Sequence, residues 1–160
     1  MLTLEPMRAE DANAIRSWRY APPYDIYDLD DDSIDELLDP RSPHYCVRDV
    51  RRKLVGFFSF GSSSLPWHTP IPTLYGEDGE IGVGLGMHPA EMGGGSGVEF
   101  VRAGVDFARN MFQPKYFHLF VYVWNARAIR VYERAGFHRI GSYRPQSEDG
   151  GRFWEMRMDL

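Results

Sequence analysis

The sequence predicts a mixed α/β fold in a single domain over residues 1–160. Short segments rich in β-branched and aromatic residues alternate with segments whose apolar residues recur at helical spacing. Apolar residues make up 43% of the chain, which is enough to bury one core. Neither a linker-like stretch nor an internal repeat divides the sequence, so we expect all its elements to share that core.

The first half of the chain is expected to form a strand, two helices and a strand pair. Ala12, Ile15 and Trp18 are spaced along one helix face, and Pro22-Pro23 ends that helix because proline cannot continue it. Acidic residues begin the second helix, where the helix dipole favours them. The expected elements are a strand over residues 2–7, helices over 9–20 and 30–39, strands over 44–50 and 53–61, and an irregular loop over 61–79 that holds three prolines and three glycines.

The second half carries clearer boundary signals. Asn125 is the expected N-cap of a helix, Gly136 follows its last residue, and Phe137 is placed to pack back on it. Alternate glycines at residues 82, 84 and 86 suggest a close backbone approach on one face of their strand. The expected elements are a strand over residues 80–88, a helix over 97–111, a strand over 116–124 buried on both faces, a helix over 125–137, and hairpin strands over 137–145 and 152–160 joined by the loop 146–151.

Composition excludes several classes of function. The formal net charge is −5, which is the wrong sign for a general nucleic-acid binder. No apolar run reaches membrane-spanning length, and the five histidines show no metal-ligand spacing, so we expect neither a membrane partner nor a metal site. Cys46 is the single cysteine, which excludes an intramolecular disulfide and favours a reducing, cytoplasmic location.

The stretch HPAEMGGGSGVEF, residues 88–100, combines a glycine run with a helix start. A strand, a glycine-rich turn and a helix N-terminus together form an anion site, because free backbone amides and the helix dipole both point at the turn. A Walker loop requires a lysine, which this run lacks. A dinucleotide fingerprint belongs in the first βαβ unit, whereas this run comes late in the chain. A surface turn without a ligand is the remaining alternative.

Two motifs resemble those of one family. Residues 92–97 resemble the Q/R-x-x-G-x-G/A loop of the GNAT superfamily of acyl-CoA-dependent N-acyltransferases. Residues 125–137, NARAIRVYERAGF, resemble that family's N-x-x-A-x-x-x-Y-x-x-x-G-F segment, and the resemblance extends from about residue 80 to the end of the chain. It implies a central, mostly antiparallel mixed sheet of about six to seven strands with about four helices, and a splayed strand pair that holds acyl-CoA.

The resemblance also implies acetyl-CoA as co-substrate, bound through backbone amides that hold its pyrophosphate. Met92 departs from the family pattern, which usually has Gln or Arg there, so a side-chain contact to phosphate is in doubt. The residues assigned to coenzyme A by the resemblance are Leu85, Gly86, Met87, Met92, Gly93, Gly94, Gly95, Ser96, Gly97 and Asn125.

Tyr132 stands where the family places its general acid. A phenol of pKa near 10 is a suitable proton donor to a departing thiolate, although Tyr132 also belongs to an ordinary core stripe. Phe120 stands where some members of the family carry a glutamate that acts as the general base. Glu80 and His118 are therefore the candidate bases, with a water chain or a structural role for His118 as alternatives.

The acceptor is expected at residues 18–32, which combine aromatic and acidic side chains. Carboxylates and aromatic faces together suit a cationic amine, whereas the alternative is a solvated acidic helix start beside core tyrosines. The residues expected to bind the acceptor are Trp18, Tyr24, Tyr27 and Asp28. The sequence thus predicts acetyl transfer to a primary amine of a small molecule or peptide, with a non-catalytic acyl-CoA sensor as the alternative. The resemblance is also compatible with a homodimer.

Overall fold

The computed structural model describes residues 1–144 and 151–160, so residues 146–150 of the expected hairpin loop lie outside the described residues. Seven strands form one sheet in the order β1-β2-β3-β4-β5-β7-β6. Neighbouring strands are antiparallel except for β4 and β5, which are parallel. This arrangement confirms the mixed, mostly antiparallel sheet. The strands are β1 (Thr3–Pro6), β2 (His44–Arg48), β3 (Leu54–Phe60), β4 (Ile81–Met87), β5 (Tyr116–Tyr122), β6 (His138–Tyr143) and β7 (Phe153–Asp159).

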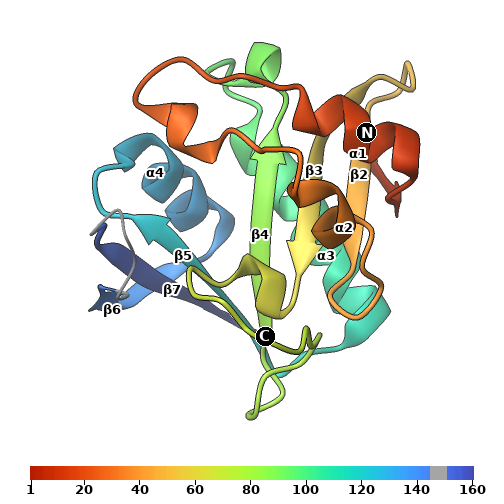
Figure 1. Ribbon diagram of the computed structural model, residues 1–160. Coiled ribbons are helices and arrows are strands. Elements are labelled where there is room, and N and C mark those ends of the chain that lie inside the picture. The colour runs from red at the N-terminus through yellow and green to blue at the C-terminus, as the bar shows by residue number, and fades with distance from the viewer. Residues whose placement is uncertain (145–150) are drawn as a thin grey trace.

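Helices lie on both faces of the sheet (Figure 1). In that view α1 and α2 lie in front of β2 and β3, and α3 lies behind the sheet. The chain between α1 and α2 crosses over the end of β4 to reach the neighbourhood of α4. The helices are α1 (Ala9–Arg16), α2 (Ser33–Leu37), α3 (Gly97–Phe112) and α4 (Ala126–Ala135), with short 3-10 turns η1 (Tyr24–Tyr27), η2 (Ser62–Ser64) and η3 (Pro89–Glu91).

Two helix predictions were too long. α1 ends at Arg16 rather than at residue 20, because the Ser17 hydroxyl and amide both bond the carbonyl of Ala14, at 2.6 and 3.1 Å. Such local side-chain bonds compete with helix continuation. α2 covers only Ser33–Leu37, because the side chain of Asp30 accepts from the Ser33 hydroxyl and holds the preceding residues in a turn. Trp18 and the proline pair therefore lie outside any helix.

The prediction that β5 is buried on both faces was wrong. Phe117, Leu119 and Val121 are buried in the core that α3 and α4 cover. His118 and Phe120 alternate with them and are only half-buried on the opposite face. Strand residues alternate between faces, so the apolar run contains one buried and one half-buried face. Phe120 and Val121, one from each face, both line the cleft described below.

The core between α3 and the sheet is built on stacked aromatic rings. The rings of Phe58 and Phe100 lie 4.8 Å apart at 17°, and both side chains are fully buried. Gly104 of α3 faces Phe58 so closely that a Cβ at that position would collide with the ring. Because interiors are packed at crystal-like density, this contact fixes how α3 lies on β3. The start of α3, which matters for the site, is thereby held in place.

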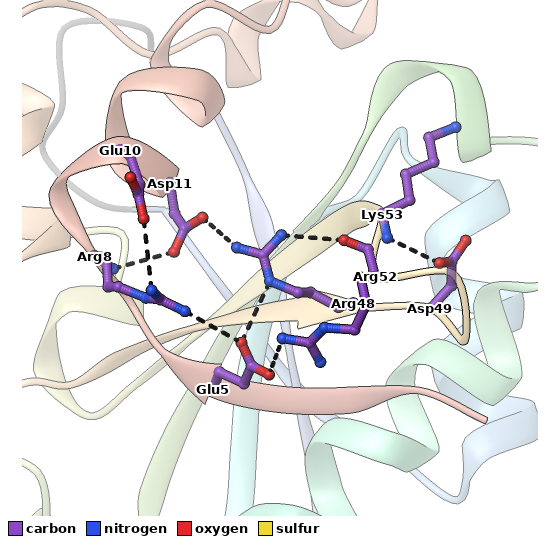
Figure 2. A network of polar contacts seen from close by, with 8 residues as sticks. All are labelled: Glu5, Arg8, Glu10, Asp11, Arg48, Asp49, Arg52 and Lys53. Atoms are coloured by element: carbon purple, nitrogen blue, oxygen red, sulfur yellow. Dashed lines mark hydrogen bonds and ion pairs between the residues drawn. The ribbon is translucent and has the colours of Figure 1, made fainter.

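A network of charged side chains fastens the N-terminal edge of the sheet (Figure 2). Arg48 of β2 donates to Asp11 of α1 at 2.5 Å and to Glu5 of β1 at 3.3 Å. Glu5 also accepts from Arg52, and these arginine bonds lower the pKa of Glu5. Asp11 is almost fully buried, so its charge depends on Arg48 for compensation.

We expect Asp11→Asn to lower the free energy of unfolding by about 3 kcal/mol, because it leaves the largely buried Arg48 guanidinium without its closest counter-charge. Urea denaturation measures the change. Asp106→Asn, on the exposed side of α3, is the matched control and should change stability by less than about 0.5 kcal/mol. Equal losses in the two variants would contradict a structural role for the network.

Candidate active site

The strands β4 and β5 pair at one end only. Ile81 pairs with Phe117 and Gly82 with His118, and no further residues of the two strands are paired. Beyond this point a cleft of about 640 Å³ opens between β4 and β5, with walls from α3, α4 and the chain that follows α1. The predicted splayed strand pair is thereby confirmed, and the cleft is where the site residues can be compared.

The backbone of β4 presents polar groups to this cleft. Gly82 accepts a bond from the β3 side, and the amide of His88 donates to β3, both at 2.8 Å. Alternate residues of an antiparallel ladder point in opposite directions, so the amides and carbonyls of Leu85 and Met87 point toward β5. The hydroxyl of Tyr20 donates to the Met87 carbonyl at 2.7 Å, in agreement with this direction. Leu85 and Met87 thus line the cleft with backbone groups as expected.

Other groups do approach the alternate glycines of β4 closely, as predicted. These groups are side chains of the protein itself rather than a ligand. A Cβ at Gly82 would collide with the side chain of Ser64 in η2, and a Cβ at Gly84 would collide with that of Ser59. A Cβ at Gly86 would collide with the ring of Phe57. Packing against the protein therefore accounts for these three glycines without a ligand.

The glycine loop before α3 has the local geometry that an anion site requires. Gly93 and Gly95 have φ of +78° and +83°, a region that glycine adopts without strain. Ser96 is the N-cap of α3 but makes no side-chain capping bond, and the first helical bond runs from Phe100 to Ser96. The amides of residues 97–99 therefore find no acceptor in the described part of the chain. Uncapped amides and the helix dipole attract an anion here.

Arg127 adds a positive charge to this site. One of its guanidinium nitrogens lies 3.5 Å from the position that a Cβ would take on Gly93. Its guanidinium also lies 4.3 Å over the ring of Tyr24, a cation–π distance. Met92 lines the same cleft without a charge. Arg127 could not be predicted as a site residue from the sequence, because it occupies an unspecified position of its motif.

Tyr132 lies on α4 in the wall of the cleft. Its ring packs edge-on against Phe137 at 6.1 Å, so the ring belongs to the core as the stripe predicted. Burial, with a smaller contribution from Tyr27, raises the pKa of Tyr132. The phenol is therefore protonated at neutral pH and available as a proton donor. Core packing and proton donation are compatible roles for this side chain.

Asn125 links α4 to the chain that follows α1. As predicted, it is the N-cap of α4, and its side-chain oxygen accepts from the amide of Ala128 at 3.2 Å. Its side-chain nitrogen donates to the hydroxyl of Tyr27 at 3.0 Å. Asn125 is almost fully buried, and both ends of its amide are engaged. It therefore holds Tyr27 at the rim of the cleft beside the first turn of α4.

The cleft gathers most of the predicted site residues. Those that line it are Leu85, Gly86, Met87, Met92, Gly93, Gly95, Gly97, Asn125, Tyr132, Tyr24 and Tyr27. Those that do not line it are Gly94, Ser96, Glu80, His118, Trp18 and Asp28. Gly94 and Ser96 still belong to the anion loop.

Three of the other residues are engaged elsewhere. Glu80 precedes β4 at the end away from the glycine loop, and its carboxylate accepts from the amide of Asp78 at 2.9 Å. Trp18 is buried, with its ring 4.9 Å from that of His88. Asp28 accepts from the amide of Tyr20 at 2.9 Å and so shapes the loop after α1. These contacts are structural rather than directed into the cleft.

His118 lies next to the cleft and has an acidic partner. Its Nδ1 atom is 3.0 Å from a carboxylate oxygen of Glu155 on β7. Its ring lies 5.6 Å from that of Phe120, which lines the cleft. When a carboxylate accepts the Nδ1 proton, the Nε2 atom is left as the proton acceptor. The sequence offered no signal for Glu155, because its position opposite β5 depends on strand pairing.

Neither a metal centre nor a membrane span is found in the part of the chain that the structure describes. Within residues 1–144 and 151–160, no three His, Cys, Asp or Glu side chains are grouped to hold a metal ion. None of the helices described there is both long and apolar enough to cross a bilayer.

The fold and the cleft define a class of protein: a mixed α/β domain that can bind an anionic ligand at a helix start and extend it between two parted strands. A family model described as an acetyltransferase (GNAT) domain matches residues 1–138, and the chain belongs to this family. A search of curated proteins finds no match.

Solved structures share the fold at low sequence identity. An aminoglycoside acetyltransferase in complex with coenzyme A is 20% identical, with a TM-score of 0.77 and coverage of 99% of this chain and 95% of that one. A chimera of a spermidine N-acetyltransferase from Vibrio cholerae is 18% identical, with a TM-score of 0.76 and the same coverage of 99% and 95%. A putative phosphinothricin N-acetyltransferase is 17% identical, with a TM-score of 0.74 over 100% and 99%.

We expect Gly95→Glu to weaken coenzyme A binding about tenfold or more, because it places a negative charge beside the amides that would hold phosphate. No atom of the described residues lies within 4 Å of the Cβ position at Gly95, so space is open, but the positive φ there strains any side chain. Gly95→Gln is the matched control, since glutamine carries the same strain and nearly the same size as glutamate without the charge. Calorimetry measures both affinities, and equal affinity of the two variants would contradict the anion-site assignment.

Proposed function

We propose that the protein transfers the acetyl group of acetyl-CoA to a primary amine of a small-molecule or peptide acceptor. The observation that carries the proposal is the parting of β4 and β5, which joins the anion loop to the phenol of Tyr132 in one cleft. Membership of the GNAT family supports it, as do the acetyltransferases among the similar structures.

The anion loop is proposed to bind the pyrophosphate of the co-substrate. The amides of residues 97–99 and the guanidinium of Arg127 supply donors and positive charge, which compensates for the uncharged Met92. The backbone groups of Leu85 and Met87 pair with the pantetheine arm and polarise the thioester carbonyl. Preorganised donors of this kind stabilise the negative charge that develops on a carbonyl oxygen under attack.

Proton transfer completes the reaction. The acceptor nitrogen attacks the thioester carbon, a C–N bond forms, and the C–S bond breaks. The hydroxyl of Tyr132 donates its proton to the departing sulfur, and a base removes the extra proton from the new amide nitrogen. Tyr132 can serve as this donor because burial raises its pKa and keeps the phenol protonated.

His118 is the better candidate for the base. It sits where β4 and β5 separate, and Glu155 holds its Nδ1 side, so Nε2 can accept a proton directly or through water. Glu80 is tied to the loop at the other end of β4. Proton removal by a water chain is the alternative to His118.

The proposed location is the cytoplasm. The chain has a single cysteine, Cys46, which is fully buried, and burial raises the pKa of its thiol to about 11. A thiol of this kind is unreactive and needs no oxidising compartment.

An acyl-CoA sensor is the second candidate function. It is favoured by Met92, which lacks the polar side chain of the family loop, and by the absence of Glu80 and His118 from the lining of the cleft. A thiol-release assay with acetyl-CoA and a panel of amines, beside a coenzyme A titration, separates the two functions. Thiol release that depends on the amine supports the transferase, whereas binding without release on any amine supports the sensor.

We expect Tyr132→Phe to lower kcat about a hundredfold while leaving coenzyme A affinity within about twofold. The substitution keeps the ring that packs on Phe137 and removes only the proton donor. Single-turnover kinetics and calorimetry measure the two quantities. If kcat is unchanged in a folded Tyr132→Phe variant, Tyr132 has only a structural role.

Two substitutions distinguish the candidate bases. His118→Gln should lower kcat about a hundredfold, because glutamine cannot take up a proton. Glu80→Gln should change kcat by less than about threefold, since this side chain only caps a loop. Steady-state rates at saturating amine provide the comparison, and a larger loss in Glu80→Gln would reverse the assignment.

A further inference from the structure

Three aromatic rings meet at the side of the cleft away from the anion loop. Trp67 follows η2, Phe120 belongs to β5, and Tyr143 ends β6. The ring of Trp67 lies 5.2 Å from Phe120 and 5.1 Å from Tyr143, and Phe120 lies 6.0 Å from Tyr143. Trp67 and Tyr143 keep 36% and 40% of their surface exposed, while Phe120 lines the cleft. We name these three residues the aromatic corner.

Glu155 projects beside the aromatic corner. It is paired directly with Phe120 across the β5–β7 ladder and with Gly141 across the β6–β7 ladder. Directly opposed strand residues share a face, so Glu155 and Phe120 lie on the same side of the sheet. No atom of residues 1–144 and 151–160 lies within 4 Å of the Cβ position at Gly141, so these residues leave the space on that side of Glu155 open.

One oxygen of Glu155 remains for a ligand. Oε2 bonds His118, whereas Oε1 has no partner in the described part of the chain, and the side chain is 32% exposed. The nearby guanidinium of Arg157 is already engaged, because it stacks 3.7 Å from the ring of Tyr116 and bonds Asp159 at 2.7 Å. A carboxylate oxygen beside exposed aromatic rings is a favourable environment for a cation.

The acidic loop after α1 is a poorer place for a cation. Asp28 is bonded to the amide of Tyr20, and Asp31 pairs with Arg16 at 3.2 Å. The ring of Tyr24 is covered by the guanidinium of Arg127, which would repel a positively charged acceptor. We therefore expect a cation to be recognised less strongly at residues 18–32, as the composition suggested, than at Glu155.

The reacting nitrogen itself does not suit this position. An amine must be neutral to attack the thioester, whereas a carboxylate and aromatic faces stabilise its protonated form. A group that stays positive throughout the reaction gains from the same surroundings. The site therefore fits a second cation on the acceptor, at some distance from the amine that is acetylated.

We propose that Glu155 and the aromatic corner of Trp67, Phe120 and Tyr143 form a subsite for a second positive charge on the acceptor, so that the preferred substrates are amines with at least two basic groups. The proposal rests on the proposed function, whose cleft it extends. It assigns specificity to residues from β5, β6, β7 and the loop after η2.

The test compares 1,5-diaminopentane with pentylamine, which has the same chain length and lacks the second cation. In the wild type the ratio of kcat/KM for diamine over monoamine should be about tenfold or more. Glu155→Gln and Trp67→Leu should each lower this ratio about fivefold, because each removes one attraction for the cation. Trp67→Phe keeps an aromatic face and should retain most of the preference. Glu77→Gln, on the exposed loop before β4, is the matched charge control and should leave the ratio unchanged.

The ratio separates recognition from catalysis. Loss of a proton relay through His118 lowers the rates of both amines equally, whereas loss of the subsite lowers only that of the diamine. A ratio near one in the wild type, or a ratio unchanged in both Glu155→Gln and Trp67→Leu, would overturn the proposal while acetyl transfer stands.

Direct binding distinguishes failure of the subsite from failure of the proposed function. Calorimetry with 1,5-diaminopentane and protein saturated with coenzyme A needs no turnover. Binding that Glu155→Gln weakens about fivefold or more, without acetylation of any amine, would support the subsite and contradict the transferase. Absence of both diamine binding and acetylation would overturn both.

Discussion

The early end of the ladder between β4 and β5 determines where the other features of the site lie. A sheet normally satisfies the backbone groups of an inner strand on both sides, and β4 is satisfied on only one side beyond Gly82. The unpaired edge faces a cleft rather than the core, so its amides remain available to a ligand, whereas the Met87 carbonyl already accepts from the Tyr20 hydroxyl. Helix α3 begins at the open end of the cleft between β4 and β5, and α4 forms one wall of this cleft. This unpaired backbone is the surface that we propose for binding of the co-substrate.

The sequence predicted most of the fold because its strongest signals are local. The N-cap at Asn125 and the left-handed Gly136 depend on neighbouring residues, and the structure has both. The errors arose where a local bond or a distant contact decided the outcome. Ser17 ends α1 early by bonding Ala14, which no apolar periodicity reveals. The half-buried face of β5 depends on which helices cover the sheet. A run of apolar residues in the sequence does not reveal which helices these are.

The candidate site divides in the same way. The anion loop and Tyr132 belong to contiguous motifs, so reading along the chain was enough to predict them as site residues. The contacts that arise from strand pairing or packing could not be predicted in this way. His118 and Glu155 are 37 positions apart, and Tyr20 and Met87 are 67 apart. Residue type and spacing cannot place such partners, because the sheet register and the path of the loop after α1 bring them together.

The loop after α1 touches the proposed co-substrate site at three points, through Tyr20 on Met87, Tyr24 on Arg127 and Tyr27 on Asn125. A segment held by both walls of one cleft cannot shift without altering each of them. If binding of the co-substrate changes the affinity for the acceptor, thermodynamic linkage requires that binding of the acceptor changes the affinity for the co-substrate by the same factor. Saturation with either substrate should therefore change the apparent dissociation constant of the other. The loop after α1 is the segment through which the two binding sites would be coupled.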